Sequence, residues 1–287
     1  MKTRLIAFFL FAASLTLRAQ VTISIYTPDE AYRSEVIDQA LFIAQYQATS
    51  VADTLHPDNR IEETMWLKVG ATRSVFYSYA RALIDSILEQ DRAAHAPREV
   101  IEQHMRQYSS AVAYQVYKNY PSGKVTFLDA VGASRFRTEE TNDRPEWTLL
   151  PDTATFIGYP CRKAVCYFKG RHYEAWYTPA ISRSEGPWKL YGLPGLILKA
   201  RDSQGYFTFT CTAIRQCHNP EPIRYPGDSY EPISRKALQK VYARYAADPL
   251  GYLAQTAPQM HVTLTGSDGK PMRPKNTPFN PIEKTEK

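Results

Sequence analysis

Hairpin after hairpin fills the middle of this chain, and this pattern limits its possible folds more than any other feature. Three short turn sequences, 121–123, 169–171 and 202–205, each separate two segments of strand-like composition. Turns this short join antiparallel neighbours, because parallel strands need connections of about a dozen residues or more. Within 206–214, apolar residues alternate with polar ones, so one face of that strand is expected to be buried. The sequence therefore predicts a large antiparallel sheet.

The N-terminal half adds strands and a pair of helices. Its strand-like segments are 21–26, 40–51, 65–70 and 74–79, the last two forming a hairpin. Apolar residues at helical spacing follow at Leu83, Ile84, Ile87 and Leu88, and Pro97 begins a second helical stretch. We predict a helical hairpin packed on one sheet face. The alternative is a mobile insertion, since 91–97 is polar and rich in alanine.

The predicted fold class is α+β, mainly β: a large curved antiparallel sheet resembling a half-open barrel, with the helical hairpin inserted at about 80–110. A C-terminal helix is expected over 234–247, where Leu238, Val241 and Tyr245 recur at helical spacing. We expect one domain over 20–265. Residues 266–287 are rich in Gly, Pro, Lys and Asn, so they are expected to form a partly ordered tail.

Residues 1–19 have the features of a secretory signal peptide. Lys2 and Arg4 precede the apolar run 5–13, and Ala19 supplies a small residue for cleavage. This run is shorter than the ~20 apolar residues of a membrane-spanning helix, and no later run is long enough. We therefore expect an exported protein, periplasmic or secreted, without a transmembrane segment after cleavage.

The charge of the chain is too small to indicate a nucleic-acid partner. The formal net charge is +6, and the leader contributes three of these charges through Lys2, Arg4 and Arg18, which leaves +3. Nucleic-acid binders cluster lysine and arginine on one element, and no such cluster occurs here. A solvated surface of mixed charge is the expected arrangement.

Residues 186–197 combine dense turn chemistry with an apolar strand. Gly186 and Pro187 precede the run Gly192-Leu193-Pro194-Gly195-Leu196-Ile197. Proline at the second position and glycine at the third are typical of a type II turn, which needs positive φ at the glycine. We expect this turn at 193–196, where it would bring Trp188 over the sheet edge.

This run and its surroundings resemble the GLPGLI family of exported bacterial envelope proteins, which has no established activity. The matching segments also include Gly158-Tyr159-Pro160-Cys161-Arg162-Lys163-Ala164, Gly170-Arg171, Ala175-Trp176-Tyr177-Thr178-Pro179, Gly186-Pro187-Trp188-Lys189 and Asn280-Pro281-Ile282-Glu283. The resemblance covers about the C-terminal half, whereas residues 20–150 are similar only in their general pattern of residues. It implies a signal-bearing, β-rich envelope protein and supplies no catalytic residues.

Four cysteines lie in the second half: Cys161, Cys166, Cys211 and Cys217. An exported chain meets an oxidising compartment, so disulfides are the first expectation. Cys161 and Cys166 would lie about 16 Å apart on one strand and cannot pair. Pairs of Cys161 with Cys217 and Cys166 with Cys211 fit neighbouring antiparallel strands. In a plain meander those strands are not neighbours, and free buried thiols are then expected.

The sequence lacks the common catalytic and cofactor motifs. It has no H-E-x-x-H, G-x-S-x-G, phosphate-binding loop or dinucleotide motif, and neither cysteine spacing is that of a structural zinc site. Cys217 and His218 are adjacent, so on an extended chain they point to opposite sides. We expect no metal and no cofactor, and a non-catalytic role is favoured.

Aromatic and basic residues supply the candidate binding site. Its residues are Arg171, Trp176, Trp188, Lys189 and Tyr191. Aromatic rings suit sugar, peptide or acyl ligands, and the cations suit a carboxylate or phosphate. The alternative is that the rings are core and rim residues of a twisted sheet.

Three functions follow in decreasing order of preference. The first is a non-catalytic module that binds an envelope protein or a glycan or apolar ligand through the aromatic face and the loop 188–197. The second is a periplasmic carrier that shelters an acyl chain in the curved sheet. The third is a hydrolase with an unrecognised site, using acids such as Glu174 or Glu185. A carrier requires an apolar cavity, a docking module an exposed aromatic patch, and a hydrolase converging titratable groups.

Overall fold

A twelve-stranded sheet organises the protein, which is represented here by a computed structural model describing residues 22–23, 34–107, 110–141, 144–226, 229–258, 262–265 and 270–284. The strand order is β13-β7-β6-β5-β4-β3-β2-β12-β11-β10-β9-β8, and the sheet does not close. All its neighbouring pairs are antiparallel except β13 with β7. The predicted mainly β, antiparallel fold class is confirmed.

The strands of this sheet are β2 (Glu35–Val51), β3 (Arg60–Gly70), β4 (Ser74–Ser78), β5 (Gln115–Lys118), β6 (Lys124–Val131), β7 (Ser134–Thr141), β8 (Thr148–Phe156), β9 (Tyr159–Phe168), β10 (Arg171–Thr178), β11 (Leu196–Asp202), β12 (Phe207–Tyr225) and β13 (Glu231–Pro232). A small second sheet contains β1 (Thr22–Ile23), β14 (Val262–Thr265) and β15 (Pro271–Met272). The helices are α1 (Tyr79–Ala93), α2 (Arg98–Gln107), α3 (Arg235–Ala247) and α4 (Pro249–Thr256).

Two meanders meet at the long strands β2 and β12. One runs from β2 to β7 and the other from β8 to β12, so most neighbours in the sheet are also neighbours in sequence. The predicted hairpins β3–β4, β5–β6, β9–β10 and β11–β12 are confirmed. Strands β7 and β8 were not predicted, because β7 is polar and β8 is an edge strand with mostly exposed side chains.

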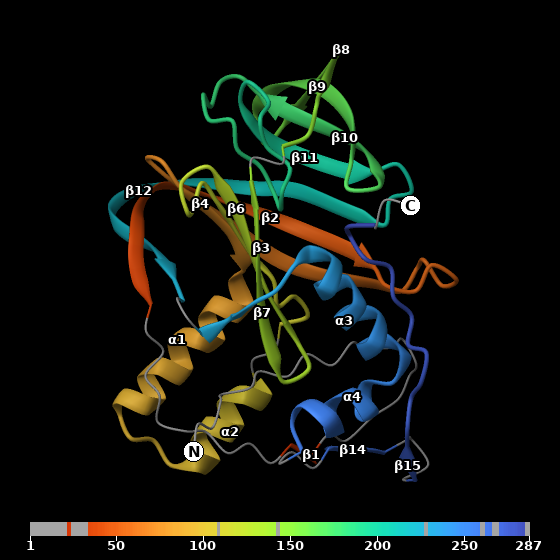
Figure 1. Ribbon diagram of the computed structural model, residues 1–287. Coiled ribbons are helices and arrows are strands. Elements are labelled where there is room, and N and C mark those ends of the chain that lie inside the picture. The colour runs from red at the N-terminus through yellow and green to blue at the C-terminus, as the bar shows by residue number, and fades with distance from the viewer. Residues whose placement is uncertain are drawn as a thin grey trace.

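The expected alternation of β12 holds only at its start. Phe207, Phe209 and Cys211 are buried, whereas Ala213 is exposed because the pairing with β2 shifts register between Cys211 and Ala213. Further shifts follow, and the strand continues to Tyr225 rather than ending at Ile214. Such irregularities bend a strand, and they allow the long strand β12 to follow the curvature of the sheet (Figure 1).

The predicted helical hairpin is confirmed as α1 and α2. The two helices are linked by a hydrogen bond between His104 Nδ1 and Asp91 Oδ2 at 2.7 Å, and α1 packs on β3 and β4. The predicted C-terminal helix is α3, whose N-cap Ser234 accepts a hydrogen bond from the Ala237 amide, and α4 follows directly. In Figure 1 both lie below β2 and to the right of β7. Among the described residues, no helix is long and apolar enough to cross a membrane.

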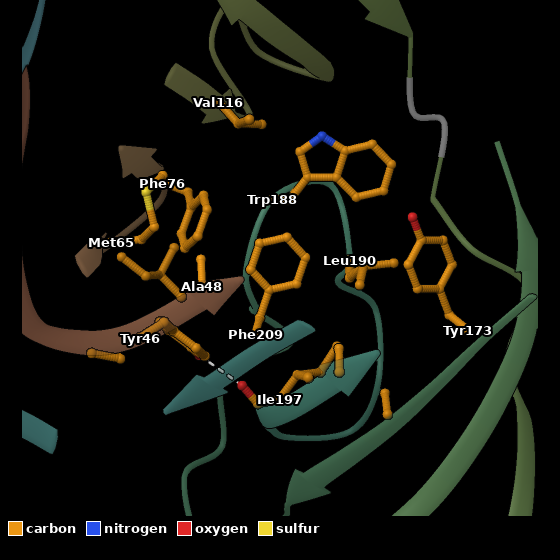
Figure 2. Packing of buried hydrophobic residues seen from close by; sticks show 14 of the residues in the cluster. Tyr46, Ala48, Met65, Phe76, Val116, Tyr173, Trp188, Leu190, Ile197 and Phe209 are labelled. Atoms are coloured by element: carbon orange, nitrogen blue, oxygen red, sulfur yellow. Dashed lines mark hydrogen bonds between the residues drawn. The ribbon is translucent and has the colours of Figure 1, made fainter. Parts of the chain in front are cut away.

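The loop between β10 and β11 places its middle part, 186–190, in the core. Trp188, Leu190 and Leu193 are at most 1% exposed, and they contact the rings and methyl groups of the inner sheet face. Figure 2 shows Trp188 above Phe209 and the Tyr46 hydroxyl donating to the Ile197 carbonyl, at 2.6 Å. The loop therefore fills part of the concavity of the sheet.

The turn at 193–196 differs from the predicted type II turn. The Leu196 amide donates to the Ile181 carbonyl at 3.2 Å, while the Gly195 amide donates to the Leu193 carbonyl at 2.8 Å. The chain thus makes a tighter turn around Pro194, because Ile181, in the loop that follows β10, supplies another acceptor for Leu196. Positive φ at Gly195 was predicted and is found, at +150°.

The predicted disulfides are not formed in the structure, and all four cysteines are free. Cys161 and Cys166 lie on β9, while Cys211 and Cys217 lie on β12. Strands β10 and β11 separate these two, so the adjacency that both pairings require is absent. This is the meander for which free thiols are expected.

The segment 277–284, which belongs to the predicted tail, is ordered against the inner face. In Figure 1 it runs from β15 past α3 toward β10. Asn280 Nδ2 donates to the Val51 carbonyl at 2.8 Å, and the Lys284 amide donates to the Lys169 carbonyl at 3.0 Å. We call this segment the C-terminal strap.

Candidate functional site

A cavity of about 590 Å³ lies between the inner face of the sheet, α3 and the C-terminal strap. Its apolar walls include Phe127, Phe207, Phe209, Leu238, Phe279 and Ile282. Small-molecule sites have volumes of roughly 300–1,000 Å³ and are lined mainly by apolar and aromatic side chains. The size and the walls of this cavity match that description.

Helix α3 supplies one wall through a single face. Its lining residues are Arg235, Leu238, Gln239, Tyr242, Tyr245 and Ala246. They recur at three- and four-residue spacing, which places them on one side of a helix. Opposite α3, strand β6 contributes Phe127, Asp129 and Val131, whose spacing of two places them on one strand face.

The cavity reaches the surface beside the turn between β2 and β3. Asp58, Asn59, Arg60 and Pro278 line it and are all exposed. This opening gives a ligand a route of entry between that turn and the C-terminal strap.

A buried acid, Asp129, faces the cavity and is 9% exposed. The Tyr242 hydroxyl donates to its Oδ2, and the Ala130 amide donates to its Oδ1 at 2.8 Å. Burial raises the pKa of Asp129 to about 6, although these hydrogen bonds and the Arg81 charge act against the rise. Burial, followed by the charge of Asp129, raises the pKa of Tyr114, a further lining residue.

Glu63 is a second buried acid in the cavity wall. Its carboxylate accepts hydrogen bonds from the Ser78 hydroxyl, from the Ser110 hydroxyl at 2.9 Å and from the Ala111 amide at 3.2 Å. All three donors are neutral. The carboxylate is therefore held in place by hydrogen bonds to hydroxyl and amide groups.

Charged side chains of both signs meet where α3 approaches the C-terminal strap. Lys189 Nζ lies 2.7 Å from Glu140 Oε1 and 2.8 Å from Glu283 Oε1, and Arg235 contacts both carboxylates. Burial alone would raise the pKa of Glu140, but Lys189 and Lys169 lower it to about 2. Burial lowers the pKa of Lys189 to about 8, despite the opposing charge of Glu140.

The five residues predicted for binding do not form one site. Lys189 lines the cavity, whereas Trp188 is fully buried in the core. Trp176 lies on the outer face of the sheet against Phe156, with ring centroids 5.7 Å apart. Tyr191 is half-buried, and its carbonyl accepts the Trp147 indole N–H at 2.9 Å.

Arg171, the fifth predicted binding residue, is fully engaged inside the protein. Its guanidinium lies 2.8 Å from Asp202 Oδ2, where both side chains are 1% exposed. It also donates to Asn280 Oδ1 at 2.6 Å and to the carbonyls of Pro281 and Ile282 at 2.6 and 3.0 Å. Arg171 therefore anchors the C-terminal strap to the sheet.

Sequence reasoning missed Asp129 and Tyr242, the polar pair in the cavity. A signal for Asp129 was present, since it replaces an apolar residue in the alternating series Val125, Phe127, Asp129 and Val131. An acid on the apolar face of a strand is expensive to bury and often functional. Tyr242 lacks such a signal, because its position depends on how α3 packs.

Comparisons with known proteins find a similarity to a family without an assigned activity. A family described as "Protein of unknown function (Porph_ging)" matches residues 112–199, which include the loop between β10 and β11. No curated protein matches the chain. Among the described residues, no group of three or more His, Cys, Asp or Glu is placed to hold a metal ion.

This chain is similar in structure to PNGF-II, which is found in two crystal forms with space groups P21 and C2. They are 13% and 14% identical to this chain, with TM-scores of 0.46 and 0.44. The matches cover 71% and 70% of this chain but only 33% and 32% of the PNGF-II chains. This chain thus spans about a third of their length, and no shared activity is inferred.

Proposed function

We propose that this protein binds an apolar or amphiphilic small molecule in the cavity beneath α3 and acts as a carrier or binding protein. The observation that supports this proposal is the cavity of about 590 Å³ with largely apolar walls and an opening at the surface. Of the functions predicted from the sequence, a carrier is the one that requires such a cavity.

The apolar walls of the cavity favour an apolar occupant. The cavity opens to the surface, so water has access to these walls when no ligand is bound. Removing apolar surface from water contributes roughly 25 cal/mol per Å². A ligand that binds the folded protein also stabilises it by mass action.

Docking through the loop 188–197 receives less support. Trp188, Leu193 and Ile197 are at most 1% exposed, so these side chains form core contacts rather than a surface. The acids considered for a hydrolase have structural partners: Glu185 binds Lys118 and Ser74, and Glu174 pairs with Lys163. Neither acid lines the cavity.

The cell envelope is the proposed location. The leader at 1–19 and the resemblance to the GLPGLI family both favour export. A periplasmic or secreted carrier would shelter an apolar molecule from the water that separates membranes. Its cargo would come from the envelope itself.

The direct test is the organic extract of mature protein, purified natively from its periplasmic fraction, analysed by mass spectrometry. A small molecule at about one equivalent is expected. A second measurement follows the fluorescence of N-phenyl-1-naphthylamine, an apolar probe, as it binds. Folded protein with a clean extract and no probe binding would overturn the proposal.

A matched pair of substitutions locates the binding. Ala246→Trp places an indole on the cavity face of α3 and is expected to weaken probe binding at least tenfold, because the ring occupies the ligand volume. Ala243→Trp makes the same change at an exposed position of α3 and is expected to leave binding unchanged. Equal probe affinity in both variants would place the probe elsewhere.

A further inference from the structure

The geometry points to a ligand that carries a hydroxyl or an ammonium group at the end of an apolar chain. This polar end would donate hydrogen bonds to Asp129 and Tyr242. This inference rests on the proposed function and adds the chemical class of the ligand. It follows from the position of Asp129, from the pairing of the other charges in the cavity, and from the acceptors that remain.

Asp129 lies in the middle of an apolar wall. Phe127 and Val131 are two residues away on either side of β6, and all three line the cavity. Leu238 lines the cavity from α3, one helical turn before Tyr242, whose hydroxyl donates to Asp129. An apolar chain lying against these walls would therefore bring its polar end to the carboxylate.

The two cations beneath α3, Lys189 and Arg235, already have anionic partners, whereas Arg60 lies at the exposed opening. Lys189 and Arg235 both contact Glu140 and Glu283, so an anionic ligand would have to compete with two carboxylates held in the protein. An incoming carboxylate at the other end of the cavity would approach the charges of Asp129 and Glu63. Like charges in a region of low dielectric repel strongly.

Asp129 keeps unused acceptor capacity. A carboxylate has about four acceptor positions. Asp129 accepts two hydrogen bonds, from Tyr242 and Ala130, and it is one of the residues that line the cavity. A hydroxyl or ammonium donor would supply the missing hydrogen bond, and charge-assisted hydrogen bonds are the stronger kind.

Groups from α3, α1, β3 and the segment before β5 act on this carboxylate and on its neighbours. Tyr242 reaches Asp129 from α3, the Arg81 charge acts from α1, and Tyr114 lies on the chain before β5. Glu63 of β3 interacts with the same Tyr114. Because burial raises the pKa of Asp129 to about 6, it is an anion at pH 7.5 and largely neutral at pH 5.

The experiment compares three ligands of equal chain length, tetradecylamine, tetradecan-1-ol and tetradecanoate, as competitors of N-phenyl-1-naphthylamine below their micellar concentrations. At pH 7.5 we expect the amine to bind more tightly than the alcohol, and both to bind at least about tenfold more tightly than the acid. At pH 5 we expect the advantage of the amine over the alcohol to disappear, because Asp129 then loses its charge.

Variants assign this preference to the carboxylate. Asp129→Asn is expected to weaken amine binding about tenfold and to leave tetradecanoate binding unchanged or tighter. Asp152→Asn makes the same change at an exposed position of β8 that does not line the cavity, so it is the matched control and is expected to keep the wild-type order. Since Asp129→Asn removes a buried charge, its thermal midpoint at pH 7.5 should not fall, so lost binding is not lost folding.

The outcomes separate the two proposals. If neither the probe nor any of the three ligands binds folded protein, the proposed function fails. If all three bind equally, or tetradecanoate binds most tightly, the cavity binds ligands but this inference is wrong. If Asp129→Asn does not fold, Tyr242→Phe and the pH comparison of the wild type test whether the ligand preference depends on Asp129 and Tyr242.

Discussion

Gly195 is fixed by a neighbouring carbonyl as well as by its dihedral angle. Its φ is +150°, and a Cβ built there would lie 2.1 Å from the Thr178 carbonyl oxygen. Backbone atoms cannot yield to such a contact as a flexible side chain can. This explains why the turn before β11 needs glycine at this position.

Gly195→Ala is therefore expected to lower the free energy of unfolding by at least about 3 kcal/mol, through steric overlap added to the cost of positive φ. Urea unfolding followed by circular dichroism measures this loss. Gly158→Ala is the control, since Gly158 has φ of +83° with nothing within 4 Å of an added Cβ. Its expected loss is only about 1 kcal/mol. Equal losses in the two variants would contradict the role of the Thr178 contact.

The charge of Glu140 stabilises the fold at neutral pH, and this contribution is lost at low pH. Its pKa of about 2 lies below the usual 4.5 because Lys189 and Lys169 favour the carboxylate, although burial opposes this. A carboxyl group with a lowered pKa stabilises the fold above the pKa of the unfolded chain. That contribution is lost as the pH falls from about 4.5 toward 2.

Glu140→Gln is expected to cost on the order of 2–3 kcal/mol at pH 7, and the difference from wild type should shrink steadily below pH 4.5. Thermal unfolding at a series of pH values between 7 and 2 measures it. Glu139→Gln changes the next residue, whose carboxylate is more exposed, and should cost less than about 1 kcal/mol. A constant difference across the pH range would contradict the assignment.

At the scale of elements, the C-terminal strap closes the protein rather than trailing from it. Arg171 binds its backbone, Lys189 pairs with its Glu283, and its side chains Phe279 and Ile282 line the cavity. The two basic residues that the sequence suggested as ligand contacts thus bind a segment of the chain itself. Both cations are buried, so losing the carboxylate or carbonyl groups of the strap would leave each positive charge partly unpaired and destabilise the fold.

A chain that ends after Asn276 is expected to lose several kcal/mol of stability and to bind 1-anilinonaphthalene-8-sulfonate, since the inner face becomes exposed. The thermal midpoint and the dye fluorescence measure both effects. A chain that ends after Lys284 keeps every described contact of the strap and should match the full chain. An unchanged midpoint in the shorter chain would show that the strap does not stabilise the fold.

For the whole molecule, the curvature of the sheet decides where a ligand can bind. The loop between β10 and β11 fills one part of the inner face with Trp188 and Leu190, while α3 and the strap span another part and leave the cavity beneath them. The same face therefore contains both a packed core and a candidate binding site. A flat sheet would leave no such enclosed volume.

The sequence by itself determined the local architecture. Short turns between alternating segments predicted the hairpins, helical spacing predicted α1, α2 and α3, and Pro194-Gly195 indicated a tight turn with positive φ. These features depend on the preferences of residues close together in the chain, which the order of amino acids states directly. The polar strand β7 and the edge strand β8 were not predicted, because they lack the alternation of apolar and polar residues typical of a half-buried strand.

Only the tertiary structure decided the long-range arrangement. The order of strands separated Cys161 from Cys217, and the packing of the strap turned Arg171 and Lys189 inward. It also brought Tyr242 of α3 onto Asp129 of β6, residues 113 positions apart, above a cavity that neither segment forms alone. Such contacts depend on sheet curvature and on the packing of distant segments. The periodicity of residues along the chain predicts neither.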